Sequence, residues 1–172
     1  MSSLSASFAP AERTLPAMLE RQAALYGDRR LIVTDEGVWT YAQAREIAAR
    51  AAATLAQAGI GKGDRVAILC GNRLAFLEIV LGCTWLGAVY VPINTASKGP
   101  QIQYVLGNCG AKLLACEADL LPALETAELS ALPLETIWAI GDVSVPDVRG
   151  CPLLRYALGT DTLAAAPVRP GD

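Results

Sequence analysis

The sequence predicts an α/β fold: a doubly wound, mostly parallel sheet with helices on both faces, preceded by an N-terminal helix and a β-hairpin. The first observation is a set of short apolar segments that begin about 23 residues apart, the repeat distance of βα units. The second is that helical start and stop signals lie between them. The predicted strands are residues 65–70, 88–93, 112–116 and 136–140. Right-handed crossovers between parallel strands then place helices on both faces.

The N-terminal segment divides into a loose part and a helix. Residues 1–13 are small and polar, which indicates a loose N-terminus. Thr14, followed by Pro16, is typical of a helix start, and we expect this helix to end near Tyr26.

A hairpin and a long helix are predicted next. Residues 31–34 and 38–41 flank the turn sequence Asp-Glu-Gly, which favours a β-hairpin. Thr40 and Gln43 have the spacing of a capping box, so they predict a helix start, and Gly59 should end that helix.

Three helices are expected to connect the strands of the sheet. Asn72 is predicted to cap the first, over residues 73–86. Pro100 should open the second, which reaches about Asn108, and residues 118–130 are expected to form the third.

Residues 74–93 have the length of a membrane span and contain a single charged residue, Glu78. Gly87 and Pro92 interrupt this stretch, so it predicts a buried helix followed by a strand that is covered on both faces. We therefore expect no membrane span. Glu78 is expected at an exposed edge of the helix, because no second carboxylate at helical spacing accompanies it.

Composition excludes several functions. The net charge is −3 without any block of like charge, which argues against electrostatic binding of nucleic acid. The chain has no histidine, so Ser-His-Asp and Cys-His catalysis and imidazole metal sites are excluded. Its five cysteines include no C-x-x-C pair, and the N-terminus does not look like a signal peptide. These features predict buried, reduced thiols and a cytoplasmic location.

The candidate binding site lies at the carboxyl ends of the predicted strands, where ligands bind in open α/β sheets. Glu117 and Asp142 follow two of these strands. Lys98 could contact a phosphate or carboxylate, although a solvated loop also explains it, just as helix capping explains Asn72. The candidates for contacting a substrate are Asn72, Asn94, Thr95 and Lys98. No catalytic, cofactor-binding or metal-ligating residue is assigned.

Residues 59–64 contain three glycines and could approach a phosphate through their backbone. They follow a predicted helix and precede a strand, whereas a phosphate loop follows a strand and opens a helix. We therefore interpret them as a helix cap and turn.

Five segments occur in an order that resembles the start of an adenylate-forming, AMP-binding enzyme: residues 38–41, 59–67, 72, 86–94 and 103–106. The resemblance covers about residues 14–170. Residues 92–96 and Gly99 are most similar to bacterial acyl-CoA synthetases and acid–CoA ligases, including the crotonobetaine/carnitine-CoA ligase and fatty-acyl-CoA ligase types.

The resemblance implies a two-step ligase. ATP and a carboxylic acid form an acyl-adenylate and pyrophosphate with Mg²⁺, and the thiol of coenzyme A then displaces AMP. The family's phosphate-binding loop and catalytic residues would follow Asp172. The resemblance thus divides the chain into a loose N-terminus (residues 1–13), an α/β subdomain (14–166) and the start of a linker to downstream subdomains (167–172).

This division implies that the chain is the N-terminal part of a longer parent and is inactive alone. Its partners would be the downstream subdomains of that parent, and the isolated piece would self-associate through its exposed docking face. Two alternatives remain open. One is a free-standing flavodoxin-like binding or interaction module, although residues 70–73 are unlike a flavin phosphate loop. The other is an interaction subunit that has lost the catalytic half of a ligase.

Overall fold

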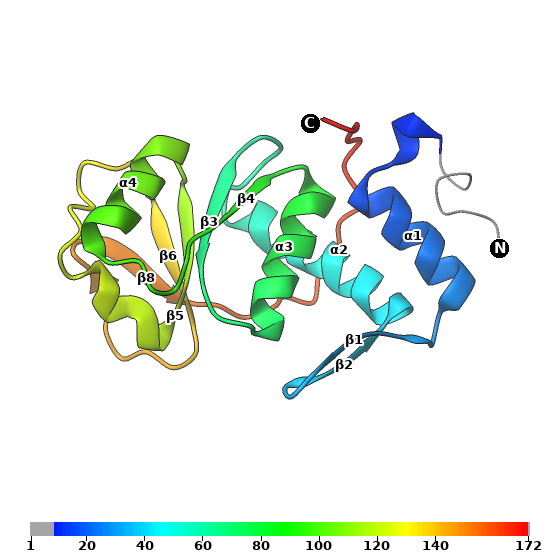
Figure 1. The fold of residues 1–172 in the computed structure, drawn as a ribbon, viewed down its shortest axis with the longest axis horizontal. Coiled ribbons are helices and arrows are strands. Elements are labelled where there is room, and N and C mark those ends of the chain that lie inside the picture. The colour runs from blue at the N-terminus through cyan, green and yellow to red at the C-terminus, as the bar shows by residue number, and fades with distance from the viewer. Residues whose placement is uncertain (1–8, 172) are drawn as a thin grey trace.

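A computed structural model describes residues 9–171 of the chain, except for the side chain of residue 11 (Figure 1). Along the chain its elements are η2 (Pro10–Glu12), α1 (Leu15–Tyr26), β1 (Arg30–Thr34), β2 (Gly37–Thr40), α2 (Tyr41–Gln57), β3 (Arg65–Leu69), α3 (Leu74–Leu86), β4 (Val89–Pro92), α4 (Gly99–Cys109), β5 (Leu113–Glu117), η3 (Ala118–Leu124), β6 (Thr136–Ile140), β7 (Asp147–Val148) and β8 (Cys151–Arg155).

The main sheet confirms the predicted fold class. Its six strands lie in the order β4-β3-β5-β6-β8-β7, and all neighbours are parallel except β7 and β8. Numbered along the chain, the five parallel strands have the order 2-1-3-4-5 of flavodoxin-like folds. The direction of winding reverses between β3 and β5. This switch point is where such folds form a crevice at the carboxyl ends of their strands.

Two apolar cores cover the two faces of the sheet. Along β3, the side chains of Val66 and Ile68 belong to the core beneath α2 and α3, while those of Ala67 and Leu69 belong to the core beneath α4 and η3. This alternation is the ordinary consequence of a pleated strand. Helices on both faces are therefore confirmed.

The predicted starts of α1 and α2 are confirmed. The Thr14 hydroxyl accepts a hydrogen bond from the Ala17 N–H at 3.4 Å. At α2, the Thr40 hydroxyl accepts from the Gln43 N–H at 3.2 Å, and the Gln43 side chain accepts from the Thr40 N–H at 2.9 Å. These reciprocal bonds satisfy backbone donors that a helix start leaves unpaired.

The predicted cap of α3 was wrong. Arg73, rather than Asn72, stands at the N-cap position, and its side chain makes no capping bond. The Leu74 N–H instead donates to the Glu36 carboxylate at 2.7 Å. The capping group thus comes from the turn of the β1–β2 hairpin.

Two further predictions were wrong. The predicted helix over residues 118–130 is the short 3₁₀ helix η3, which ends at Leu124 and contains Pro122. A proline inside a helix removes a backbone donor, so the segment continues as turns. The strand after α3 is also not covered on both faces: β4 is an edge strand in which Val89 is 44% and Tyr90 38% exposed.

The interpretation of residues 74–93 as a helix and a strand is confirmed, with the left-handed Gly87 (φ +79°) between α3 and β4. No helix among residues 9–171 has both the length and the apolar character needed to cross a membrane. Residues 1–8 of the predicted loose N-terminus lie outside the described residues, and Pro10–Glu12 form η2.

The C-terminal segment lies along α2 and α3 (Figure 1). The Leu163 N–H donates to the Ala49 carbonyl at 3.1 Å, and the Trp85 indole N–H donates to the Leu163 carbonyl at 2.9 Å. The Ala166 N–H then donates to the Trp85 carbonyl at 2.8 Å. These bonds bring residues 167–171 close to the C-terminal end of α3.

Candidate functional site

The four candidate residues lie in loops at the carboxyl edge of the sheet. Asn72 is exposed in the loop between β3 and α3, and Asn94 and Thr95 are exposed after the neighbouring strand β4. The Asn94 side chain accepts a hydrogen bond from the Ala96 N–H at 2.9 Å, which shapes its own turn. Their role in binding a substrate stays a prediction.

Lys98 is exposed and immediately precedes α4, as a solvated loop residue would be. It borders a hollow of about 370 Å³ whose other lining residues belong to η3 and the turn after it, namely Asp119, Leu120, Pro122, Ala123, Glu125 and Thr126. Asn72, Asn94 and Thr95 do not line this hollow, so the structure does not bring the four candidates into one cavity.

A charged group that the sequence analysis missed lies at the switch point between β3 and β5. The Arg73 guanidinium pairs with the carboxylates of Glu36, in the hairpin turn, and Glu117, at the end of β5. Its Nη1 lies 2.6 Å from Glu117 Oε1. We call these three residues the Arg73 cluster. The only sequence signal was the position of Glu117 at a strand end.

Hydrogen bonds stabilise the ionised forms in the Arg73 cluster. The Leu74 N–H and the Arg73 guanidinium lower the pKa of Glu36. The Gly71 N–H, 3.0 Å from Glu117 Oε2, and Arg73 lower the pKa of Glu117. Both carboxylates raise the pKa of Arg73. All three groups are therefore charged at neutral pH, with a net charge of about −1.

Burial disfavours the ionised form of the thiols at the sheet core. Burial, with the charge of Glu117, raises the pKa of Cys70 to about 12, and burial raises the pKa of Cys116 to about 12. Such thiols are protonated at neutral pH and are poor nucleophiles. All five cysteines are free and four are buried, which confirms the predicted burial of most thiols.

The prediction that Glu78 lies at an exposed edge was wrong. Glu78 is half-buried in α3, and its carboxylate accepts a hydrogen bond from the Tyr156 hydroxyl at 2.9 Å. Burial raises the pKa of Glu78. The Tyr156 ring in turn lies 5.3 Å from the Trp138 ring between centroids. This pair therefore ties the end of β8 to α3.

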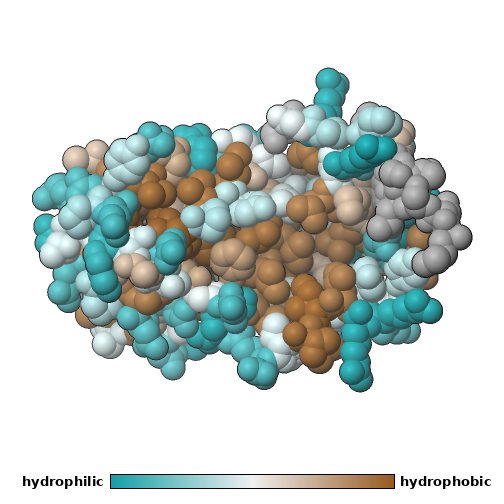
Figure 2. Space-filling model, viewed as in Figure 1, coloured by the Kyte–Doolittle hydropathy of each residue, from teal (hydrophilic) through white to brown (hydrophobic). Residues whose placement is uncertain are grey.

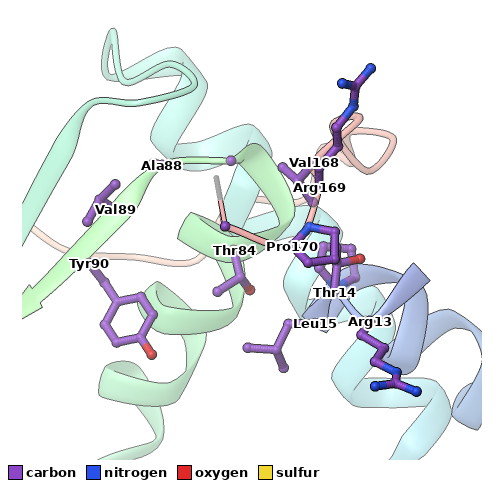
Figure 3. A pocket seen from close by; sticks show the side chains of 13 residues that line it. Arg13, Thr14, Leu15, Thr84, Ala88, Val89, Tyr90, Val168, Arg169 and Pro170 are labelled. Atoms are coloured by element: carbon purple, nitrogen blue, oxygen red, sulfur yellow. The ribbon is translucent and has the colours of Figure 1, made fainter. Parts of the chain in front are cut away.

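A cavity of about 500 Å³ lies at the amino end of β4, away from the predicted site (Figure 3). Tyr90, Thr84 and Leu15 face its interior, while the guanidinium groups of Arg13 and Arg169 lie at its rim. The remaining lining residues are Thr14, Pro16, Gly87, Ala88, Val89, Val168, Pro170 and Gly171. Three distant segments build this cavity, so no local sequence pattern indicated it.

The glycine-rich residues 59–64 form the predicted cap and turn. The Gly61 N–H donates to the Asp64 carboxylate at 2.9 Å, so this backbone donor is engaged within the turn itself. Among the described residues no group of three or more cysteine, aspartate or glutamate side chains is arranged to hold a metal ion.

Comparison with known proteins identifies the family. Residues 19–148 match the AMP-binding enzyme family. The long-chain-fatty-acid–CoA ligase FadD13 of Mycobacterium tuberculosis is 39% identical over 98 residues, which are 57% of this chain and 20% of that protein. The fatty acid–[acyl-carrier-protein] ligase ScoC of Streptomyces coeruleorubidus is 37% identical over 103 residues, 60% of this chain and 20% of that protein. The chain thus spans about a fifth of these relatives.

Solved structures agree. A fatty acyl-CoA synthetase of M. tuberculosis has a TM-score of 0.69 and 31% identity over 74% of this chain and 26% of that chain. The anthranilate CoA ligase AuaEII, in complex with anthranoyl-AMP, shares the fold, with a TM-score of 0.74 and 24% identity over 91% of this chain and 32% of that chain. The family match covers most of the described fold, and the chain belongs to the AMP-binding enzyme family.

Proposed function

We propose that the chain is the N-terminal part of an ATP-dependent, AMP-forming carboxylic acid–CoA ligase. The observation that carries this proposal is the 39% identity to FadD13 over 98 residues, together with the match of residues 19–148 to the AMP-binding enzyme family. The name of that relative makes a fatty acid the first substrate to test. The flavodoxin-like strand order alone favours no other function, because one fold supports many activities.

The proposed reaction has two balanced steps. A carboxylate oxygen of the acid attacks the α-phosphorus of ATP, which forms an acyl-adenylate and releases pyrophosphate. The sulfur of coenzyme A then attacks the acyl carbon, the thiol loses its proton, and AMP leaves with the electron pair of the broken bond. Adenylation thus converts a poor leaving oxygen into a good one, and Mg²⁺ would neutralise the phosphate charge.

We expect this chain alone to bind none of ATP, Mg²⁺ and coenzyme A, because the candidate groups near the sheet edge already have partners within the chain. Arg73 is held between two carboxylates, and the Gly61 N–H is engaged by Asp64. The acidic side chains of the Arg73 cluster are paired with that same arginine. We therefore assign nucleotide binding and catalysis to the remainder of the parent, and to this chain the role of one wall of the active-site cleft.

The outer face of α3 is the proposed docking face for that remainder. Leu74, Leu77, Leu81 and Thr84 share this face by their helical spacing, and each is partly exposed. A helix that is apolar all round is normally buried, yet apolar side chains gather at the surface over α3 (Figure 2). Two hollows of about 500 and 670 Å³ flank it, and Leu15 lines both.

In the parent we expect downstream subdomains to cover this docking face, and in the isolated chain we expect it to drive self-association. The net charge of −3 and the absence of any charge block support a protein without a nucleic-acid partner. A cytoplasmic location fits five free thiols.

The proposal is tested by adenylation assays on the chain and on its parent. Sequencing the gene past the codon for Asp172 should reveal an open frame with a Thr/Ser/Gly-rich loop that ends in Pro-Lys. Pyrophosphate release is then measured with ATP, Mg²⁺, coenzyme A and a panel of fatty and aromatic acids. We expect turnover by the parent and none by residues 1–172 alone.

Two outcomes would contradict the proposal. A stop codon directly after Asp172 would make the chain a free-standing module. Turnover by residues 1–172 would place the catalytic residues within this chain and refute its assignment as a structural wall.

A further inference from the structure

The switch point between β3 and β5 is filled by the protein's own charges. In flavodoxin-like sheets the crevice at this point receives a ligand. Here Arg73 lies at the carboxyl end of β3, Glu117 ends β5, and their side chains meet at 2.6 Å. The Glu117 side chain is only 19% exposed, so it lies within the edge rather than above it.

Two carboxylates hold the loop between β3 and α3 from opposite sides. Glu117 uses one oxygen for the Gly71 N–H and the other for Arg73. Glu36 likewise uses one oxygen for the Leu74 N–H and the other for Arg73. Each carboxylate therefore accepts one hydrogen bond from a backbone N–H and one from the Arg73 guanidinium. Charge-assisted bonds of this kind are stronger than neutral ones.

The tip of the β1–β2 hairpin is joined to Arg73 and Leu74 through Glu36. The hairpin is a separate two-stranded sheet, and such sheets are marginally stable alone. Its base is anchored by the Tyr41 N–H, which donates to the Arg29 carbonyl at 3.0 Å. Near its tip, Val33 is 66% and Val38 43% exposed, so apolar burial does little to hold them.

We propose that Arg73 is the positioning residue of a latch that joins the hairpin tip, through Glu36, to the end of β5, through Glu117. The latch occupies the switch point and fixes the hairpin against the carboxyl edge of the sheet. It goes beyond the proposed ligase function and does not depend on it, because every contact lies within the described chain.

Hydrogen exchange of the 172-residue chain tests the latch. Arg73→Gln should speed exchange of the amides at residues 33–38 about fivefold, because their opening no longer breaks two charge-assisted contacts. The matched control is Arg155→Gln. Arg155 also forms an ion pair at this edge, 3.0 Å from Asp142, but that pair is exposed and does not touch the hairpin. We expect the control to leave exchange at the tip unchanged.

Two further measurements separate a latch from a general loss of stability. Arg73→Lys keeps a cation that can reach only one carboxylate, so it should restore exchange at the tip to an intermediate rate. About 1 M NaCl should accelerate exchange at the tip of the unmodified chain, because salt screens partly exposed ion pairs. This salt measurement decides the question even if Arg73→Gln does not fold.

Unchanged exchange at residues 33–38 in high salt would overturn the latch. So would an equal rise in exchange across all helices and strands in Arg73→Gln, because that result indicates a global role. The latch is supported if Arg73→Gln raises the exchange rate only at residues 33–38 and Arg73→Lys gives an intermediate rate there.

Discussion

The two sides of α3 differ in how completely they are packed. On the inner side, Gly82 lies so close to α2 that an added Cβ atom would come within 2.7 Å of the Ala51 Cβ and 2.8 Å of its carbonyl carbon. On the outer side, Leu77 and Leu81 are partly exposed, and Leu81 lines an open hollow. One side of this helix is thus fully packed, and the other is partly exposed.

This difference shows which side of α3 is fully packed by residues of the chain itself. The inner side of α3 joins a core that contains fully buried Ile79 and Cys83, and it needs nothing further. The outer side is equally apolar but is only partly buried. Because α3 is apolar all round, its sequence does not indicate which side is buried. Only the fold distinguishes the two sides.

The largest expected effect is at the inner contact. Gly82→Ala should lower the free energy of unfolding by about 2 kcal/mol, because overpacking against the α2 backbone outweighs the gain in helix propensity. The matched control is Gly107→Ala in α4, where the new methyl would meet only the flexible end of Leu132 at 3.3 Å. Urea unfolding should show that the control is as stable as the parent sequence or more so; equal losses for both variants would refute the comparison.

The next effect concerns the half-buried pair of Glu78 and Tyr156. Tyr156→Phe removes the hydroxyl that donates to Glu78 and leaves the carboxyl without this partner. We expect a loss of about 1 kcal/mol in the free energy of unfolding, because a half-buried carboxyl loses a hydrogen-bond partner. Tyr104→Phe is the control, since Tyr104 is 71% exposed and should tolerate the change. A Tyr156→Phe variant with unchanged stability would show that water replaces the hydroxyl.

The outer side should respond in association rather than in stability. Leu77→Lys is expected to reduce self-association of the isolated chain while it changes the free energy of unfolding by less than about 0.5 kcal/mol. Val145→Lys, at a loop residue that is 52% exposed, adds the same charge elsewhere. Sedimentation velocity and binding of an apolar dye give the readout. Monomers in the unmodified chain at high concentration would contradict the docking face.

The smallest expected effects are on the pH dependence of the free energy of unfolding. They have opposite signs for Glu78 and Glu36. The pKa of Glu78 is raised by burial, so the folded chain loses stability as pH rises through that pKa. Glu78→Gln should therefore gain relative stability between about pH 4 and pH 7. The pKa of Glu36 is lowered by the Leu74 N–H and Arg73, so its contribution is present at neutral pH and is lost in acid.

Glu36→Gln should accordingly cost more at about pH 7 than at about pH 3. Urea unfolding of the two glutamine variants across this range gives the measurement. Parallel pH profiles for both variants would contradict the opposite environments of the two carboxyl groups.

Local signals predicted much of the fold. Two predictions that depend only on neighbouring residues are confirmed. They are the capping box of Thr40 and Gln43 and the apolar strand β6. The strand β8 was missed because Pro152 interrupts its pattern, which a strand next to the sheet edge tolerates. The α-helix expected at residues 118–130 was wrong, because the effect of Pro122 was given too little weight. This proline lies inside the short helix η3, which ends at Leu124.

The candidate site was less predictable, because its contacts are distant in sequence. Glu36 and Glu117 lie 37 and 44 residues from Arg73, so no local spacing joins them. Asn72 was expected to cap α3, whereas Arg73 stands at the N-cap position and the capping carboxylate belongs to Glu36. When the capping carboxylate belongs to another element, no periodic pattern in the helix sequence predicts it.

The edge position of β4 has a consequence for aggregation. The N–H groups of Val89 and Ile93 donate to the carbonyls of Asp64, just before β3, and Ile68, within β3. The backbone nitrogens of Tyr90 and Pro92 therefore face away from β3. Proline has no N–H, so a strand from another molecule would find only the Tyr90 donor along this edge. Copies of the chain that stick together should therefore meet through side chains and form discrete oligomers, and growth into continuous intermolecular sheets is disfavoured from this edge.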